Sequence, residues 1–535
     1  MNPLSFTVIT DVHYYSKKLG VGTKSYNKIN AASQFLIRDS AEVIEAAFAQ
    51  IAKSPDEIVL ICGDTTRDGD YESHAEFINM LRALQKCGKR VYAITSTHDY
   101  KDDGITYKYT SDEKEEIPAA KRDELFDMYY EFGPSSAVSV YKEGLSYVTD
   151  LDESTRLFAL NSDKDGSGRS GFSPEHIEWI KEQAEIANSL GKRMIAITHH
   201  PIISPSSFYT IIGKNNIMNH NDEVADLLAD LGIHLAFSGH THIHDISYRF
   251  SPSGNVIYDV STSALVGYPG YMRRVLLTDD KAYIKSKSIT EPVHGELEGC
   301  DLQAAMTDQF FGMVRRTIES ASSDMHTFAD CANAISIPRK GVYKFGWLIK
   351  PLVKLLNNLT VGKVARLTKA ENGLSPEEYS DIADENVVDF IIDLATHLYA
   401  GDSPYTPDTA YYKIAISVAK IIDGFLNTIH LPFRKIVKGF DSAEAVLTPL
   451  LYNGGICDKE AELKLNASEE DVAEICAKVS DSDVNNSKKG PAILAVLILL
   501  ILILIPLLPA VAVIVGAGFA INYIKFNKEI RGIKE

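Results

Sequence analysis

Five short runs of β-branched and aliphatic residues each end in a motif that contains an acid or a histidine. The runs cover residues 6–10, 57–62, 90–95, 194–197 and 234–238. The motifs that follow them are, in this order, Asp11-Val12-His13, Gly63-Asp64, Ser96-Thr97-His98-Asp99, Thr198-His199-His200-Pro201 and Gly239-His240-Thr241-His242. Because such runs alternate with helical stretches, for example 38–53 and 74–88, an α/β domain is predicted over residues 1–295.

The residue types in these motifs predict a metal site. In an open α/β sheet the carboxyl ends of the strands line the ligand crevice, so we expect the motifs to meet at one edge. Asp11 and His13, like His240 and His242, are two residues apart, a spacing that on an extended chain places both side chains on one face. Carboxylate and neutral imidazole ligands suit Mn, Fe or Zn. A single pair of this kind is more often only hydrogen-bonded, so the ordered set carries the prediction.

The ordered series DxH, GD, a His-Asp pair, HHP and GHxH resembles the signature of the calcineurin-like metallophosphoesterases, and the resemblance covers residues 1 to about 290. Residues 6–14, GDTTRDG at 63–69, the helix start at 172–179 and a helical C-terminal domain look most like the bacterial class III cyclic-nucleotide phosphodiesterases. The resemblance implies an α+β sandwich of the metallophosphoesterase type. It also implies metal-dependent hydrolysis of a phosphoester, with a cyclic nucleotide or another small phosphodiester as substrate and a metal-bridging hydroxide as nucleophile.

The same resemblance assigns roles to individual residues. It implies two divalent metal ions, one bound by Asp11, His13 and His242, the other by His199 and His240, with Asp64 bridging them. His98 matches the catalytic histidine of the family, as a general acid towards the leaving alkoxide or as a donor to a phosphate oxygen, and Asp99 would hold its ring.

One residue departs from the family pattern. The family reads Gly-Asn-His-Asp or Gly-Asn-His-Glu where this chain reads Ser96-Thr97-His98-Asp99, so Thr97 stands at the position of an asparagine metal ligand. A neutral hydroxyl is a poorer ligand than an amide oxygen, which leaves weak binding, an extra water or a missing ion as alternatives for the second metal. A second hypothesis follows, that the chain is a catalytically weakened metal-binding scaffold or sensor at the membrane.

The pattern of apolar residues changes after the first domain. From 296 to 480 the strand pattern stops, and apolar residues at three- and four-residue spacing predict an all-α domain with helices near 301–322, 341–369, 376–400 and 407–429. Three interpretations of this domain stay open. It caps the metal cleft, it mediates oligomerisation or docking near a bilayer, or its basic 341–369 stretch is a buried helix hairpin broken at Pro351.

A membrane segment is predicted at the C-terminal end, after a polar linker at 481–490. Residues 491–524 run 34 positions without a charge, which is too long for one upright helix and short for two full spans. Pro506 and Pro509 near its middle leave a kinked, tilted helix and a re-entrant hairpin as alternatives, and a basic tail follows at 525–535. Because the 6–10 strand leaves no room for a signal peptide, we expect a membrane-anchored protein with a cytoplasmic catalytic domain.

Charge and cysteine content exclude other classes of protein. With 54 Lys+Arg against 72 Asp+Glu, the net charge of −18 argues against a nucleic-acid polymer as partner, and a phosphate ligand then needs a local positive charge. The six scattered cysteines form no CxxC pair, which excludes a zinc ribbon and a dense disulfide framework and favours a reducing compartment. The expected partners are a small phosphoester and the membrane, and the oligomeric state is left open.

Overall fold

The computed structural model describes residues 3–206, 209, 216–334, 339–401, 404–435, 437, 439–452 and 455–482. The predicted membrane segment 491–524, the basic tail 525–535 and the linker from 483 onward lie outside these residues. Among the helices of the described part, none combines the length and the apolar character that crossing a bilayer requires.

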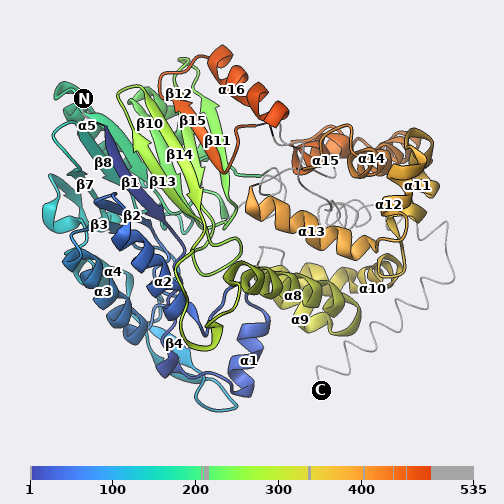
Figure 1. Cartoon of the computed structure of the whole chain (residues 1–535), viewed down its shortest axis with the longest axis horizontal. Helices are drawn as coiled ribbons and strands as arrows, with labels where there is room; N and C mark the ends of the chain where they lie inside the picture. Colours follow the sequence, from blue (N-terminus) through green and yellow to red (C-terminus); the bar gives the residue numbers. More distant parts are fainter. Residues whose placement is uncertain are drawn as a thin grey trace.

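Two β-sheets form the centre of the first domain (Figure 1). The six-stranded sheet has the order β15 (Glu460–Lys464), β14 (Lys281–Lys287), β13 (Met272–Leu277), β1 (Leu4–Ile9), β2 (Ile58–Cys62) and β3 (Arg90–Ile94). The seven-stranded sheet has the order β11 (Asp245–Phe250), β12 (Val256–Ser261), β10 (Ile233–Ser238), β9 (Arg193–Ile197), β8 (Thr155–Ala159), β7 (Ser146–Asp150) and β6 (Ser139–Tyr141). A short hairpin joins β4 (Ile105–Lys108) and β5 (Glu115–Pro118).

The sheets pack face to face with helices on both outer sides. The core between them includes Phe6 and Phe237, whose ring centroids are 5.6 Å apart. The six-stranded sheet is covered by α2 (Ser40–Lys53) and α3 (Tyr71–Lys86), and the seven-stranded sheet by α5 (Pro174–Ser189) and α7 (Asn221–Asp230). The predicted α+β sandwich is therefore present in the described residues. The smaller elements of this domain are α1 (Lys24–Ala31), α4 (Arg122–Met128), η1 (Lys17–Leu19), η2 (Pro134–Ser136), η3 (Lys142–Gly144) and η5 (Gly295–Leu297).

A helical region follows and has a core of its own. It contains α8 (Leu302–Ser323), α9 (Met325–Ala334), α10 (Arg339–Leu356), α11 (Val361–Thr368), η6 (Ala370–Gly373), α12 (Pro376–Ile382), α13 (Val387–Ala400), α14 (Ala410–Thr428), η7 (Phe433–Lys435) and α15 (Ala443–Leu451). The predicted break at Pro351 is wrong, because α10 continues through this proline. Buried Ile349 and Val353 on either side of Pro351 belong to the core of the region, and this packing outweighs the local preference against proline.

The chain returns to the sandwich after the helical region, a return that the sequence pattern does not predict (Figure 1). Strand β15 pairs antiparallel with β14, with Ala461 opposite Ile284 and Leu463 opposite Ala282. Leu463 and Val472, the latter on α16 (Glu469–Ser482), join the core between the sheets. The prediction that strands end near residue 295 is therefore wrong, because a five-residue edge strand rich in Glu and Lys carries little apolar pattern of its own.

Candidate dinuclear metal centre

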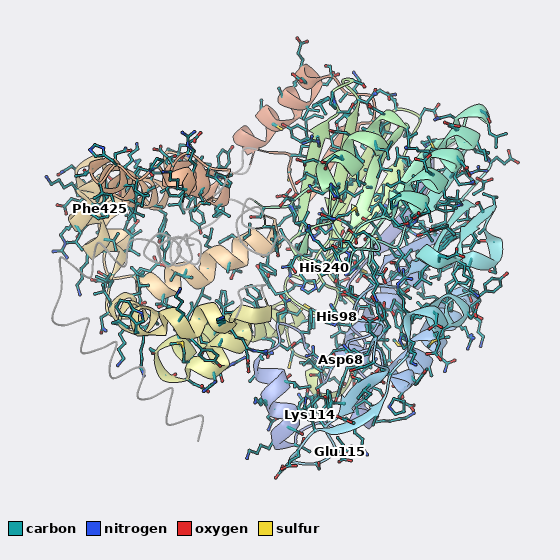
Figure 2. The ribbon with its side chains drawn as sticks, turned by 180° about the vertical axis from the view of Figure 1, so that it is seen from behind. Asp68, His98, Lys114, Glu115, His240 and Phe425 are labelled. Atoms are coloured by element: carbon teal, nitrogen blue, oxygen red, sulfur yellow. The ribbon has the colours of Figure 1, made fainter. Side chains whose placement is uncertain are left out.

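The five strand-end motifs meet in space, but they come from two sheets and not from one. Strands β1, β2 and β3 belong to the six-stranded sheet, and β9 and β10 belong to the seven-stranded sheet. Face-to-face packing brings the two sets of strand ends together. Figure 2 shows His98 and His240 close to one another on the side of the sandwich that faces the helical region. The prediction of a single sheet edge is corrected accordingly.

The predicted metal ligands form overlapping groups in which the candidate ligand atoms all lie within 4.8 Å of one another. These groups are Asp11, His13 and His242; Asp64, His199 and His240; and His13, Asp64 and His98. The first two reproduce the ligand sets expected for two ions. Asp64 and His13 each belong to two groups, and Asp64 is the residue expected to bridge.

Contacts within the groups fit a divalent ion. His242 Nε2 lies 3.1 Å from Asp11 Oδ1 and 3.4 Å from His13 Nε2, and His199 Nε2 lies 3.1 Å from Asp64 Oδ2. The buried His13 Nδ1 has no hydrogen-bond partner among the described residues. The Nδ1–H of His199 donates to the Cys62 carbonyl at 2.8 Å, which leaves its Nε2 facing Asp64. Carboxylate oxygens and imidazole nitrogens that converge in this way are suitable ligands for Mn, Fe or Zn.

Electrostatics give most of these groups the charge that metal binding needs. Burial would raise the pKa of Asp11, but His242 and His199 hold this pKa well below its usual range. Burial acts in the same direction on Asp64, and His199 and His98 hold its pKa well below the usual range. Both carboxyls are therefore ionised near neutral pH.

The histidines divide into two kinds. Burial lowers the pKa of His13 to about 4 and that of His240 to about 3, so both rings are neutral and keep a lone pair for a metal. Burial would also lower the pKa of His199, but the carboxylates of Asp64 and Asp11 raise it to about 9. His199 is therefore protonated near neutral pH in the metal-free chain.

Five predicted ligands have left-handed backbone conformations, which are rare for residues other than glycine. The φ angles are 49° at Asp11, 43° at His13, 48° at Asp64, 64° at His240 and 59° at His242. The expectation that the two i, i+2 pairs lie on extended chain is thus wrong. Each pair follows the end of its strand. Asp11 and His13 fall in one ligand group, whereas His240 and His242 fall in two different groups. Strained backbone of this kind is typical of functional sites.

The two glycines that precede ligands act through different causes. Gly63 has φ +96°, and a Cβ there would lie 2.7 Å from His199 Nδ1. A Cβ on Gly239 would lie 2.1 Å from Thr10 Oγ1 and 2.2 Å from Asp11 Oδ2. Gly63 therefore allows both the turn and the close approach of His199, whereas Gly239 allows two loops to approach one another.

His98 is partly buried and joins the site through two backbone groups. Its N–H donates to Asp64 Oδ1 at 3.0 Å, and its ring Nδ1–H donates to the Arg67 carbonyl at 2.6 Å. The predicted role of Asp99 in holding the ring is wrong. The Asp99 carboxylate instead accepts the backbone N–H groups of Ser96, Thr65 and Thr66, and so joins two loops.

Thr97 lies at the tip of the turn between Ser96 and Asp99 and is partly buried. That Thr97 binds the second metal in place of an asparagine stays a prediction. The neighbouring Ser96 hydroxyl is buried and has no hydrogen-bond partner among the described residues.

Other residues at the site carry no sequence signal. Gln34 lies 2.5 Å from His242 Nδ1, measured from its Nε2, and the Phe35 ring lies 4.2 Å from the His13 ring. Both belong to the connection between α1 and α2, more than 200 residues from His242. Only the folded chain brings Gln34 and Phe35 to the ligands. His200, by contrast, stands in the HHP motif beside His199; it is buried, contacts the Ser162 hydroxyl through Nδ1 and packs its ring 4.2 Å from that of His240.

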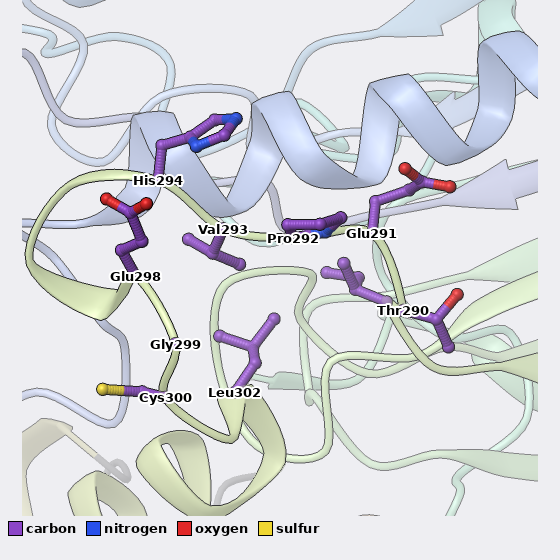
Figure 3. Close-up of a pocket in the computed structure, with 10 residues that line it drawn as sticks. Thr290, Glu291, Pro292, Val293, His294, Glu298, Gly299, Cys300 and Leu302 are labelled. Carbon is purple, nitrogen blue, oxygen red and sulfur yellow. The ribbon is translucent and has the colours of Figure 1, made fainter.

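A separate pocket of about 310 Å³ lies on the connection between β14 and α8 (Figure 3). Ten residues between Ile289 and Leu302 line it, including Glu291, His294, Glu298 and Cys300. None of the predicted site residues lines this pocket, so we place the chemistry at the strand ends.

Comparison with protein families supports this assignment. Residues 4–244 match the calcineurin-like phosphoesterase family, and this range spans the expected ligands of both metals. No curated protein sequence matches the chain. Residues 4–244 therefore form a calcineurin-like metallophosphoesterase domain, and the resemblance drawn from the motifs is confirmed at this level.

Solved structures of similar proteins include a dimetal phosphatase from Danio rerio, at 14% identity and a TM-score of 0.36 over 54% of this chain and 98% of that one. A purple acid phosphatase from yellow lupin seeds is 11% identical, with a TM-score of 0.36 over 55% of this chain and 53% of that one. GAP50, the anchor in the inner membrane complex of Plasmodium, is 10% identical, with a TM-score of 0.32 over 58% of this chain and 95% of that one.

Proposed function

We propose that this chain, whose residues 4–244 form a calcineurin-like metallophosphoesterase domain, hydrolyses a small phosphodiester such as a cyclic nucleotide with two divalent metal ions. The observation that carries the proposal is the pair of ligand groups, Asp11 with His13 and His242, and Asp64 with His199 and His240. The preference for a diester rests on the motif resemblance and is the finer part of the proposal.

Two metal ions would polarise the phosphoryl oxygens and lower the pKa of a bound water, and they would supply the positive charge that an acidic chain lacks. The chain itself contributes the ionised carboxyls of Asp11 and Asp64, which anchor that charge in a buried place. Strained backbone at five ligands fixes their directions before a substrate arrives.

His98 is the residue that we assign to proton transfer. Its Nδ1–H is held by the Arg67 carbonyl, so Nε2 is the ring atom left to face the reaction. Because His98 shares a ligand group with His13 and Asp64, this Nε2 can reach a group bound between the metals. A proton on Nε2 would pass to the leaving alkoxide, or would be shared with a phosphate oxygen.

An activity screen tests this function. The full chain, purified in detergent and loaded with Mn²⁺, is given bis-p-nitrophenyl phosphate, 3′,5′-cyclic AMP and the monoester p-nitrophenyl phosphate. We expect Mn-dependent turnover of the diesters that exceeds turnover of the monoester. Faster turnover of the monoester than of the diesters would support a phosphoesterase but contradict the assignment of a diester substrate.

The alternative is a metal-binding scaffold or sensor, and Thr97 is the residue that favours it. A chain that binds two Mn²⁺ ions and hydrolyses none of the three substrates would support the scaffold and overturn the enzyme.

We also propose that residues 491–524 attach the chain to a membrane and that the catalytic domain lies on the cytoplasmic side. The charge-free run supports attachment, and residues 339–369 carry eight Lys or Arg and no acid. On this stretch Leu355 is 54% exposed and Leu367 is 74% exposed, and Phe425 of α14 lies at the outer end of the helical region (Figure 2). Flotation with liposomes should carry the full chain and should fail for a chain that ends at Ser482.

A further inference from the structure

We propose that Gln34 positions His242 for metal binding and that the helical region holds Gln34 in place. This inference rests on the proposed metal centre and assigns to α8 and α13 a part in its assembly. The helical region then supports the site from behind the ligands.

The contact between Gln34 and His242 has the geometry of an outer support. Gln34 Nε2 lies 2.5 Å from His242 Nδ1, while Nε2 on the opposite side of that ring faces Asp11 Oδ1 at 3.1 Å. A histidine that binds a metal through Nε2 carries its proton on Nδ1, and this proton needs an acceptor. A half-turn of the Gln34 amide presents Oε1 to it, which fixes both the tautomer and the ring direction.

Helix α8 holds the segment that carries Gln34. Gln309 Nε2 donates to the Asn30 carbonyl at 3.0 Å and to the Ser33 carbonyl at 2.7 Å, and Arg316 Nε donates to the Ala31 carbonyl at 3.0 Å. All three acceptors are backbone groups within four residues of Gln34. The position of the Gln34 backbone therefore depends on side chains that lie about 280 residues later in the chain.

Helix α13 holds the ligand loop itself. The His244 N–H donates to the Tyr399 carbonyl at 3.1 Å, two residues after His242. The backbones approach so closely that a Cβ on Gly401 would lie 2.0 Å from the His244 carbonyl oxygen. Leu398 and Tyr399 also pack against the buried cluster that contains Ile243.

The two holding helices form one unit. The rings of Phe310 on α8 and Tyr399 on α13 lie 4.8 Å apart, and both helices contribute to the same apolar core. The packed pair of helices thus contacts both the Gln34 segment and the His242 loop. A change in the distance between these two segments would alter the binding of the ion at Asp11, His13 and His242.

The experiment measures metal binding and not hydrolysis. The full chain is stripped with a chelator and titrated with Mn²⁺ by calorimetry. We expect Gln34→Ala to lower the affinity for one of the two Mn²⁺ ions by roughly 10- to 100-fold, the usual cost of losing an outer-shell partner. The affinity for the other ion should stay unchanged. Gln34→Glu, which keeps an acceptor for the Nδ1–H, should restore most of the affinity.

Gln309→Ala tests the second half of the proposal and should lower the affinity for the same ion by a smaller factor. Gln303→Ala is the matched control, because Gln303 lies on the same helix and its side-chain nitrogen has no hydrogen-bond partner among the described residues. Unchanged Mn²⁺ affinities in Gln34→Ala would overturn the positioning role, and equal losses in Gln309→Ala and Gln303→Ala would overturn the link to α8. A wild-type chain that binds no Mn²⁺ would instead overturn the metal centre.

Discussion

The strand-end loops and the helical region follow opposite rules of local structure. In the loops after β1, β2 and β10, five non-glycine residues have left-handed φ angles, and all five are expected metal ligands. In the helical region, helices begin at residues whose side chains accept a first-turn N–H, as Thr360, Ser375, Asn386, Thr409 and Ser442 do. Left-handed residues there, such as Lys369, stand at helix ends.

This difference shows where the protein accepts strain. A left-handed non-glycine residue costs about 1–3 kcal/mol and persists only if its surroundings hold it in place. Around the ligands, two packed sheets supply those surroundings. Buried ionised carboxyls and neutral histidines supply the chemistry. The helical region has an aliphatic core instead, so it contributes to the stability of the fold. Substitutions should therefore separate function from stability.

The largest effect should come from Asp64→Asn. The amide keeps the shape of the side chain, and asparagine tolerates the left-handed backbone, so the fold should survive. Loss of the charge between two cations should remove at least one ion and reduce hydrolysis by more than the roughly 100-fold cost of losing an outer-shell partner. Metal content by plasma mass spectrometry and turnover of bis-p-nitrophenyl phosphate measure both effects.

Asp68→Asn is the control for that change, because Asp68 lies four residues later on the same loop and pairs with Arg67 and Lys101 (Figure 2). It should keep both ions. Two bound ions and a normal rate in Asp64→Asn would contradict the ligand assignment.

His98→Ala separates proton transfer from metal binding. Both ions should stay, while the rate falls by roughly 10²- to 10⁴-fold, the usual contribution of a positioned acid or base. The loss should be smaller for bis-p-nitrophenyl phosphate than for 3′,5′-cyclic AMP, because p-nitrophenolate leaves without protonation. Equal losses on both substrates would argue against a general acid.

Leu447→Ala should produce the reverse pattern, with stability lost and metal retained. Leu447 is fully buried in α15, which packs against α14, so the cavity should cost about 2–5 kcal/mol of unfolding free energy. Urea unfolding followed by circular dichroism measures this cost, and Leu355→Ala, at an exposed position, is the control. A loss of bound Mn²⁺ in folded Leu447→Ala would show that the two regions are not separable there.

Asp259→Asn tests the stability cost of a buried acid inside the sandwich. Burial raises the pKa of Asp259 from 3.8 to about 6, so the folded chain binds more protons than the unfolded chain between these values. The stabilisation is complete below pH 4 and is lost as pH rises through 6. In metal-free protein, the variant should lose less unfolding free energy between pH 4 and 7, by an amount on the order of 2 kcal/mol.

The exposed Glu185→Gln is the control for Asp259→Asn. A wild-type pH dependence in Asp259→Asn would show that this acid is not responsible for it.

The smallest effect should come from Thr97→Asn. If the hydroxyl is a weak ligand, an amide oxygen should tighten the ion at Asp64, His199 and His240 and raise activity at limiting Mn²⁺, with little change at saturation. Calorimetric titration of both chains decides the point. An unchanged or weaker second affinity in the variant would show that the missing asparagine is no defect in metal binding.

Much of the site could be predicted because its residues stand beside strong local signals. Short β-branched runs mark strand ends, and the order of the acids and histidines after them identifies their chemistry. The prediction failed where the signal is not local. Asp99 stands next to His98 in the sequence, yet its carboxylate holds Thr65 and Thr66, and a carbonyl from Arg67 holds the His98 ring.

The helical region shows the same division. Apolar spacing located most of its helices, but neither the continuation of α10 through Pro351 nor the role of β15 could be read from spacing. Strand β15 is an edge strand that gains its place from pairing with β14, some 175 residues earlier. Pairing over such distances depends on the completed core, which no window of sequence contains.

The sequence by itself determined which residues carry the chemistry, because ligand type and strand-end position are local properties. The tertiary structure alone decided how they meet. Two sheets had to pack before β1 and β10 could bring Asp11 and His242 within 3.1 Å, and α8 had to dock before Gln34 could be held behind His242. The physical reason is that strain at the ligands and contacts across hundreds of residues are stable only in the packed protein, where many weak interactions act together.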